Sequence, residues 1–302
     1  MVPYFTQKTK WTIPLNPRTI AIINHVHRMT TQQVKSLLQQ YDISPLESLS
    51  QNFFVDRPLL EKMLTKAQIE SGDHVVEIGP GLGSLTQALL DRGCPVTAFE
   101  LDATLAKVLP EILGDPGDLT VYHKDILESA TELDQVPSPY KVVANIPYHI
   151  TGGIIRFLLT HTNRPESITL LIQKEVAEKL TTDSTSYSLQ RLSVEIYATI
   201  DKILIVPKES FYPRPKIDSA VIVMQPHDMF IDFDREAVVQ FAKRIFQWKR
   251  KQVASTVKKV FGVPVEVTAE ILSSMDLPED VRPEQIGLSE WVELYAALEA
   301  NI

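Results

Sequence analysis

The stretch "VVEIGPGLGSLT", residues 75–86, decides the fold of this chain. An apolar run ends at Gly79, a glycine-rich turn follows, and an amphipathic segment begins at Ser84. Glycine allows the backbone to turn tightly and to approach a ligand closely. The stretch therefore predicts a buried strand, a ligand-binding turn and a helix, in that order.

The same alternation continues along the chain. Runs of strand length at residues 74–79, 95–102, 119–126, 141–146 and 167–173 are separated by helical or turn-rich segments, and two further strands, within 195–207 and 218–226, are joined by a proline-rich loop. This pattern predicts an α/β fold with a mostly parallel sheet, helices on both faces and an antiparallel hairpin at one edge. After Pro226 only helices are expected, so we place a boundary between residues 29–226 and a smaller helical domain, 227–302.

Composition narrows the class of protein. Of the 302 residues 44% are hydrophobic and 23% are charged, which is typical of a folded globular protein. The single cysteine, Cys94, excludes an internal disulfide framework and a metal centre built of cysteines, and it favours a reducing compartment. No apolar run approaches the roughly 18 residues that span a membrane. We therefore expect a cytoplasmic protein, a monomer, with no bound metal and no membrane partner.

The first 41 residues contain no acidic side chain. Such a composition is found in transit peptides, but the segment has few serines and no clear amphipathic pattern. Met29 starts a natural first helix, "MTTQQVKSLLQQY". We therefore interpret residues 1–28 as an extension, with a targeting segment as the alternative.

The glycine turn differs from a dinucleotide site. Its glycines are spaced G-x-G-x-G, and Glu77 lies in the strand directly before them. The dinucleotide fingerprint needs G-x-G-x-x-G, and a pyrophosphate would be repelled by the carboxylate. S-adenosylmethionine, which is cationic and has no phosphate, fits the turn at Gly79 and Gly81 better. At the ends of the next two strands, Glu100 can accept from both ribose hydroxyls and Asp125 from the adenine amino group.

The stretch "ANIPYHI", residues 144–150, ends the fourth strand with an amide, a rigid turn and an aromatic ring. The side-chain oxygen of Asn145 and the carbonyl of Ile146 can accept both N–H groups of an adenine amine, which localises the nitrogen lone pair. Pro147 stiffens the turn, and Tyr148 offers a stacking surface to a flipped base. The alternative is an Asn turn with a core Tyr, but the neighbouring cofactor-type turn favours the catalytic interpretation.

At this point the chain resembles the ribosomal RNA adenine N6-dimethyltransferases. The matching stretches are "SQNFFVD" (50–56), "VVEIGPGLGSLT" (75–86), "FELD" (99–102), "KDIL" (124–127), "NIPYHIT" (145–151), "LIQKEVAEKL" (171–180), "RLSV" (191–194), "FYPRPKIDSAVI" (211–222) and "RPEQIG" (282–287). The resemblance implies a Rossmann-like sheet that binds S-adenosylmethionine, a smaller helical C-terminal domain, and dimethylation of two adjacent adenosines near the 3′ end of small-subunit rRNA. It also implies that Gln51, Asn52 and Phe54 close over the methionine end, and that Phe211 forms the second wall of the base pocket.

Some positions depart from the family pattern. Ser50 stands where a Gly is usual, "SYSLQ" precedes "RLSV" in place of Tyr-Gly, and Lys249-Arg250-Lys251 replaces Arg-Arg-Lys. These changes touch loops and RNA recognition more than the chemistry. The rival interpretations are a 23S rRNA dimethyltransferase of the macrolide-resistance type, a catalytically idle assembly or transcription factor, and a DNA adenine methyltransferase. The small-subunit enzyme is favoured, because "EIGPG", "LIQKE" and "RPEQIG" resemble it and the catalytic residues are intact.

The net charge of −8 hides a basic segment. Residues 237–265 contain seven Lys and Arg residues and no Asp or Glu. On one continuous helix, Arg244, Trp248, Lys251, Ser255 and Lys258 would share a face. We expect this stripe to bind small-subunit rRNA, with a solvated helix face as the alternative. The predicted RNA-binding residues are Arg244, Lys249, Arg250, Lys251 and Lys258.

Overall fold

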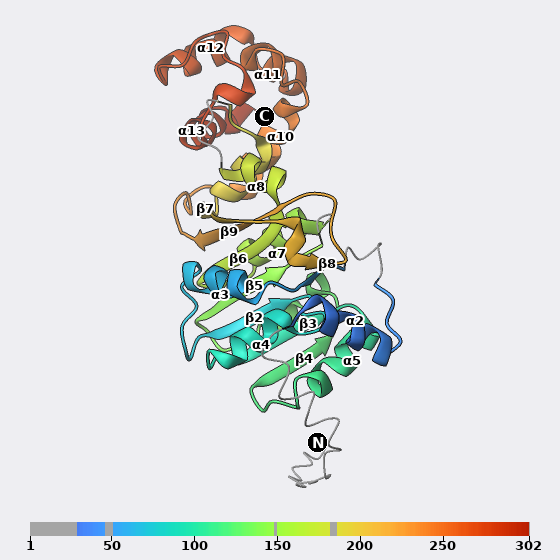
Figure 1. Cartoon of the computed structure of the whole chain (residues 1–302). Helices are drawn as coiled ribbons and strands as arrows, with labels where there is room; N and C mark the ends of the chain where they lie inside the picture. Colours follow the sequence, from blue (N-terminus) through green and yellow to red (C-terminus); the bar gives the residue numbers. More distant parts are fainter. Residues whose placement is uncertain (1–28, 46–50, 148–149, 182–185, 302) are drawn as a thin grey trace, which may run out of the picture.

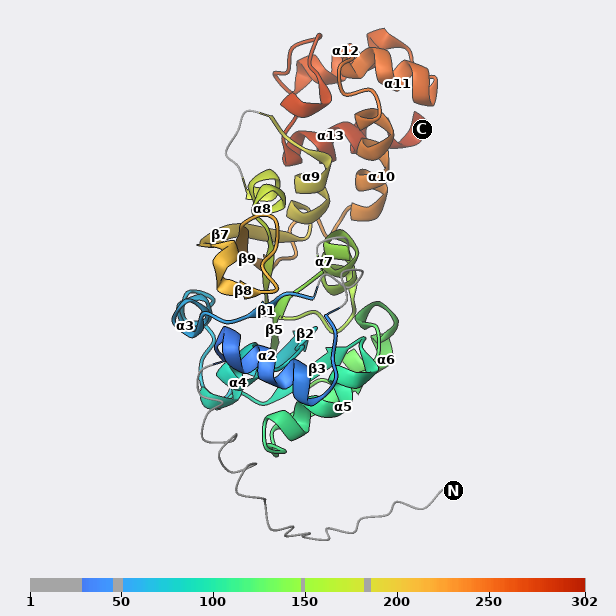
Figure 2. The ribbon, with the colours of Figure 1, turned by 45° about the vertical axis from the view of Figure 1, so that its right-hand side comes forward.

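The computed structural model describes residues 29–45, 51–147, 150–181 and 186–301 (Figure 1). The predicted extension, residues 1–28, lies outside the described residues, and so do Ser50 and Tyr148. A sheet covered by helices forms one part of the molecule, and the helices after Pro226 gather at one end, where their hydrophobic core continues into that of the sheet (Figures 1 and 2).

Within the described residues the central sheet has seven strands in the order β4-β3-β2-β5-β6-β9-β7. Their bounds are β2 His74–Ile78, β3 Val96–Glu100, β4 Leu119–His123, β5 Tyr140–Asn145, β6 Ser167–Gln173, β7 Ala198–Val206 and β9 Ser219–Pro226. Strands β2 to β6 run parallel, whereas β9 is antiparallel to both β6 and β7. The predicted α/β fold and edge hairpin are therefore confirmed.

The strand order reverses between β2 and β5, which are direct neighbours. In an open α/β sheet such a reversal opens a crevice at the carboxyl ends of the strands, where ligands bind. Ile78 of β2 pairs with Phe99 of β3 and with Ala144 of β5. The register consequently brings the turn after β2, Glu100 and Asn145 to the same edge of the sheet.

Alternate residues of the central strands face opposite layers. Val75 packs into a core with Leu64 of α3 and Leu89 of α4, whereas Val76 packs into a larger core with Ile154 of α7. This alternation explains the continuous apolar runs in the sequence, since a strand covered on both faces has no solvent side. The covering helices are α2 Thr31–Gln40, α3 Arg57–Lys66, α4 Ser84–Asp91, α5 Ala103–Ile112, α6 Ala130–Leu133, α7 Thr151–Thr160, α8 Lys174–Thr181 and α9 Leu189–Glu195, with the 3₁₀ turns η2 Ile126–Glu128 and η4 Lys208–Ser210.

A short second ladder was not predicted. Strand β1, Phe53–Phe54, pairs antiparallel with β8, Phe211–Tyr212. It ties the stretch "SQNFFVD" to the proline-rich loop between β7 and β9. The helix predicted after Met29 is present as α2, and Thr30 and Gln33 cap it reciprocally.

The helices after Pro226 are α10 Arg235–Phe246, α11 Val253–Phe261, α12 Val265–Ser274 and α13 Leu288–Leu298, with η5 Pro283–Gln285 and η6 Glu299–Asn301. Phe241 of α10 lies edge-on to Trp291 and Tyr295 of α13 in their core. No helix in the described ranges is long and apolar enough to cross a membrane.

The expectation that the basic segment forms one continuous helix is wrong. Helix α10 ends at Phe246, and α11 begins only at Val253. The N–H of Val253 donates to the carbonyl of Val281 at 2.9 Å instead of to the preceding turn of a helix. Burial of Val253 and Ala254 against this loop thus overrides the helical pattern. Arg244, Trp248, Lys251, Ser255 and Lys258 therefore do not share one helical face.

Candidate active site

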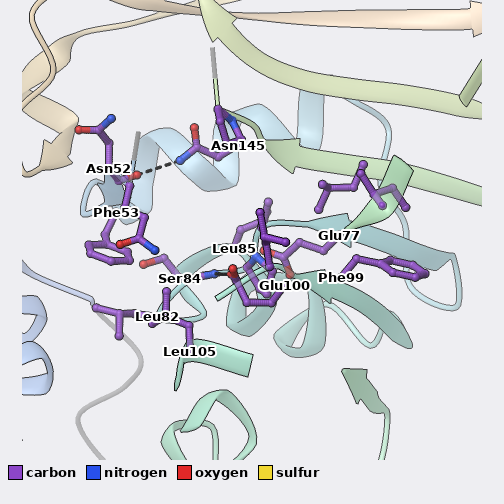
Figure 3. A pocket seen from close by; sticks show the side chains of 18 of the residues that line it. Asn52, Phe53, Glu77, Leu82, Ser84, Leu85, Phe99, Glu100, Leu105 and Asn145 are labelled. Atoms are coloured by element: carbon purple, nitrogen blue, oxygen red, sulfur yellow. Dashed lines mark hydrogen bonds between the residues drawn. The ribbon is translucent and has the colours of Figure 1, made fainter. Parts of the chain in front are cut away.

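A cavity opens at the carboxyl ends of β2, β3 and β5 (Figure 3). The glycine turn and residues 51–54, which we call the cover segment, form adjoining parts of its wall. All nine predicted cofactor residues line it: Gln51, Asn52, Phe54, Glu77, Gly79, Gly81, Glu100, Asp125 and Asn145. The cavity therefore brings together predicted residues that lie up to 94 positions apart in the chain, from Gln51 to Asn145.

The turn packs closely under the cover segment. Gly79 and Gly81 have φ values of 69° and 58°, which lie in the left-handed region that favours glycine. A Cβ at Gly81 would come within 3.1 Å of the Phe53 ring. A larger residue at this position would thus strain the backbone and push the cover segment away from the turn.

Glu100 is a rigidly held acceptor. One carboxylate oxygen accepts from the N–H of Gly81 at 3.0 Å, and the other accepts from the N–H of Asp102 at 2.9 Å. The residue is 6% exposed. Burial raises the pKa of Glu100 above its usual range, and the two N–H groups oppose that shift. Each oxygen keeps further acceptor capacity, so the carboxylate can receive two hydroxyl groups of a ribose.

Glu77 is the most deeply buried acid of the site. It is 1% exposed, and its Oε2 has no hydrogen-bond partner among the described residues. Burial raises the pKa of Glu77 to about 8, and the neighbouring Glu100 adds to the shift. An ammonium or sulfonium group brought near this carboxyl would stabilise its ionised form.

Asn145 ends β5 with its side chain held in one orientation. Its Nδ2 donates to the backbone carbonyl of Asn52 at 2.9 Å, as the dashed line in Figure 3 marks. A carbonyl can only accept, so the amide atom that faces Asn52 must be the nitrogen. Oδ1 consequently points away from Asn52 and remains an acceptor for another group. Pro147 lines the cavity beside Asn145, and Ile146 is 2% exposed.

The two aromatic residues predicted to hold a base have different placements. Tyr148 lies outside the described residues. Phe211 is 3% exposed and meets the Phe54 ring edge-on, with centroids 5.1 Å apart. In this structure Phe211 supports Phe54 from behind and does not line the cavity.

The residues beyond β4 complete the far wall. Asp125 lines the cavity, and its Oδ1 accepts from the N–H of Leu127 at 2.9 Å. This bond starts η2, so Asp125 follows the strand, which ends at His123, and does not belong to it. Phe99, stacked on Tyr122 at 5.2 Å, also lines the cavity. Sequence reasoning missed the apolar walls Phe53, Leu82, Leu85, Phe99 and Leu105, because they look like ordinary core residues.

The predicted RNA-binding residues separate into two groups. Arg250 and Lys251 line a hollow between the loop that follows α10, helix α11 and the loop before η5, together with Trp248, Lys259 and Arg282. Lys259 lies over the Trp248 ring, with its Nζ 3.3 Å from the ring centre. Arg244 is engaged elsewhere, since it donates to the carbonyl of Val260 at 3.0 Å and covers the Phe261 ring. Lys249 and Lys258 are exposed outside the hollow.

Two solved structures share this fold. A dimethyladenosine transferase from Plasmodium falciparum superposes with a TM-score of 0.71 at 23% identity, over 82% of this chain and 98% of that one. The 23S rRNA methyltransferase ErmE superposes with a TM-score of 0.66 at 25% identity, over 82% of this chain and 100% of that one. The fold and the cavity at its switch point define a Rossmann-like methyltransferase.

Sequence comparison narrows this class to one family. A sequence model described as ribosomal RNA adenine dimethylase matches residues 46–290. Ribosomal RNA small subunit methyltransferase A of Lactobacillus delbrueckii subsp. bulgaricus is 34% identical over 290 residues, which cover 91% of this chain and 98% of that protein. The corresponding protein of Dehalococcoides mccartyi strain CBDB1 is 32% identical over 266 residues, covering 87% and 91%. The chain therefore belongs to the ribosomal RNA adenine dimethylase family and is an rRNA adenine dimethyltransferase.

Proposed function

We propose that this enzyme uses S-adenosylmethionine to dimethylate N6 of two adjacent adenosines near the 3′ end of small-subunit rRNA. The observation that supports the proposal is the orientation of Asn145, because the bond from its Nδ2 to the Asn52 carbonyl turns the amide oxygen away from Asn52. This orientation occurs beside a cavity with two buried carboxylates and a glycine turn. An acceptor aimed at an amine and a site for a cationic cofactor together suit transfer of a methyl group to nitrogen.

Different residues of the cavity would bind different parts of the cofactor. Glu100 would hold the ribose, Asp125 the adenine amine of the cofactor, and Glu77 its cationic end. When bound, S-adenosylmethionine supplies the methyl group. Phe99 and the other apolar walls exclude water from the adenine.

At the substrate base, Asn145 Oδ1 and the Ile146 carbonyl would accept the two N–H groups of the target amine. These bonds favour a pyramidal nitrogen whose lone pair faces the donor. Pro147 keeps the two acceptors in place, and Tyr148 would stack on the base. The methylated ammonium is acidic and loses its proton to water, so no separate base is needed. Phe211 would act through Phe54, or would become part of the pocket once the base enters.

The small-subunit substrate is supported by the relatives. The two curated relatives above carry that name and match 87–91% of this chain. The second candidate, 23S rRNA, rests on the superposition with ErmE. The basic hollow around Trp248 would bind the RNA, because exposed Lys and Arg side chains contact phosphates and the indole ring can stack on a base.

The test is methyl transfer by the purified enzyme from labelled S-adenosylmethionine to small and large ribosomal subunits that lack these modifications. We expect label in the small-subunit rRNA, as N6,N6-dimethyladenosine. Label in the large-subunit rRNA alone would make the second candidate correct.

A further inference from the structure

A chain of hydrogen bonds joins the carboxylate of Glu100 to the amide of Asn145. The N–H of Asp102 donates to Glu100 Oε1 at 2.9 Å, and Gln51 Nε2 donates to Asp102 Oδ2 at 3.3 Å. The next residue, Asn52, accepts from Asn145 Nδ2 at 2.9 Å. The cover segment thus contacts the segment after β3 through Gln51 and the end of β5 through Asn52, whose bond to Asn145 is drawn in Figure 3.

We propose that the side-chain bond between Gln51 and Asp102 is a latch that holds the Asn52 carbonyl in place and so orients the Asn145 amide for catalysis. In this inference, which rests on the proposed function, Gln51 and Asp102 are positioning residues. Sequence reasoning placed Gln51 beside the cofactor and assigned no role to Asp102.

The anchoring of the cover segment is uneven. Its C-terminal side is held firmly, because Phe53 and Phe54 are each 6% exposed and pair with β8, and the N–H of Val55 donates to the carbonyl of Ser210 at 2.8 Å. The N-terminal side, at Gln51 and Asn52, is only half-buried. The latch is one contact that ties this side to the segment following β3. Asn52 lies next to it, so a shift of Gln51 moves the carbonyl that Asn145 depends on.

Asp102 has two separable duties. Its Oδ1 accepts from the N–H groups of Thr104 and Leu105 at 2.8 and 3.0 Å, and so caps α5. Its Oδ2 makes the latch. Asn is as good a helix cap as Asp. In Asp102→Asn the N–H groups of Thr104 and Leu105 should keep the new side-chain oxygen at the start of α5. The new NH₂ group then faces the NH₂ group of Gln51, and two donors cannot form a hydrogen bond with each other.

This separation permits a swap. Gln51→Glu alone sets two carboxylates against each other. In Gln51→Glu with Asp102→Asn, the new carboxylate accepts from the new amide, and the net charge of the chain is unchanged. The latch is restored with its donor and acceptor exchanged.

The experiment measures single-turnover methyl transfer to small ribosomal subunits at saturating cofactor and saturating RNA. We expect each single variant to be slower by about tenfold, since a charge-assisted hydrogen bond is lost and a repulsion added. The double variant should return to within about threefold of the wild-type rate. Asp234→Asn is the matched control, because Asp234 caps α10 in the same way and does not line the cavity. Its rate of methyl transfer should equal that of the wild type.

Amide hydrogen exchange supplies a second readout that does not depend on activity. Exchange at Gln51 and Asn52, on the side of the cover segment that the latch holds, should be faster in both single variants and normal in the double variant, whereas exchange at residues 53–55 should be unchanged. The proposed latch would be refuted if the double variant were no faster than the single variants. It would also be refuted if the single variants reached the wild-type rate at saturating cofactor and RNA. If the wild-type enzyme labels no small-subunit RNA, the proposed function fails, whereas the exchange measurement still tests the latch.

Discussion

Replacing Asn145 by Ala should nearly abolish methyl transfer while the protein stays folded. The change removes the only side-chain acceptor that the proposal aims at the reacting amine. Loss of one preorganised contact of this kind lowers a rate by about 10²–10³. The structural cost is small by comparison: one bond from Nδ2 to the Asn52 carbonyl, at a half-buried position, contributes about 1 kcal/mol. A large kinetic effect should therefore appear with a modest loss of stability.

The assay is single-turnover transfer of labelled methyl groups to small ribosomal subunits at saturating cofactor, with unfolding by urea measured in parallel. Asn163→Ala is the matched control. Asn163 Nδ2 also donates to backbone carbonyls, those of Leu133 at 2.9 Å and Val136 at 3.1 Å, and it lies away from the cavity. The control should lose stability and keep its rate. An Asn145→Ala enzyme that transfers methyl groups within about threefold of the wild-type rate would refute the reasoning.

Three further outcomes are expected. Glu100→Ala should weaken S-adenosylmethionine binding by about tenfold or more, because hydrogen bonds to charged groups contribute about 1.5–3 kcal/mol. The affinity for RNA should not change. An unchanged cofactor dissociation constant in calorimetry would mean that Glu100 does not bind the cofactor. The raised pKa of Glu77, about 8 against 4.5, means that the empty protein loses stability as pH rises from about 4.5 through 8, by up to about 1.4 kcal/mol per pH unit. Glu77→Gln should lack this loss in urea unfolding at pH 5, 6.5 and 8, and parallel pH profiles would contradict the burial argument. A triple variant in which Lys249, Arg250 and Lys251 are each replaced by Gln should bind ribosomal subunits with a weaker salt dependence, the slope of log affinity against log salt concentration being smaller by about two. Equal slopes for the variant and the wild type would mean that the basic segment is only solvated surface.

The layers of the fold, its mostly parallel sheet and the hairpin at one edge could be predicted because they follow local patterns, whereas the order of the strands in the sheet was not predicted. Each apolar run between helical segments became a strand of the parallel sheet, and the absence of a helix between the last two runs predicted the hairpin of β7 and β9. The break after Phe246 could not be predicted. It depends on a bond between Val253 and Val281, and nothing in the local sequence shows that contact.

The polar half of the site could be predicted, because acids and amides at strand ends are unusual and must meet at one edge of a parallel sheet. The contacts that orient them could not. Asn52 and Asn145 are 93 positions apart, and the bond uses a backbone carbonyl, which every residue has. The pairing of β1 with β8 is equally hidden, since two residues are too few to show a strand period.

The most direct test of the central claim is mass spectrometry of N6,N6-dimethyladenosine in both rRNAs from cells that lack this gene. We expect the modification to disappear from the 3′ end of small-subunit rRNA, and we expect the wild-type gene to restore it whereas Asn145→Ala does not. Unchanged dimethyladenosine at that end, or loss from the large-subunit rRNA alone, would contradict the central claim.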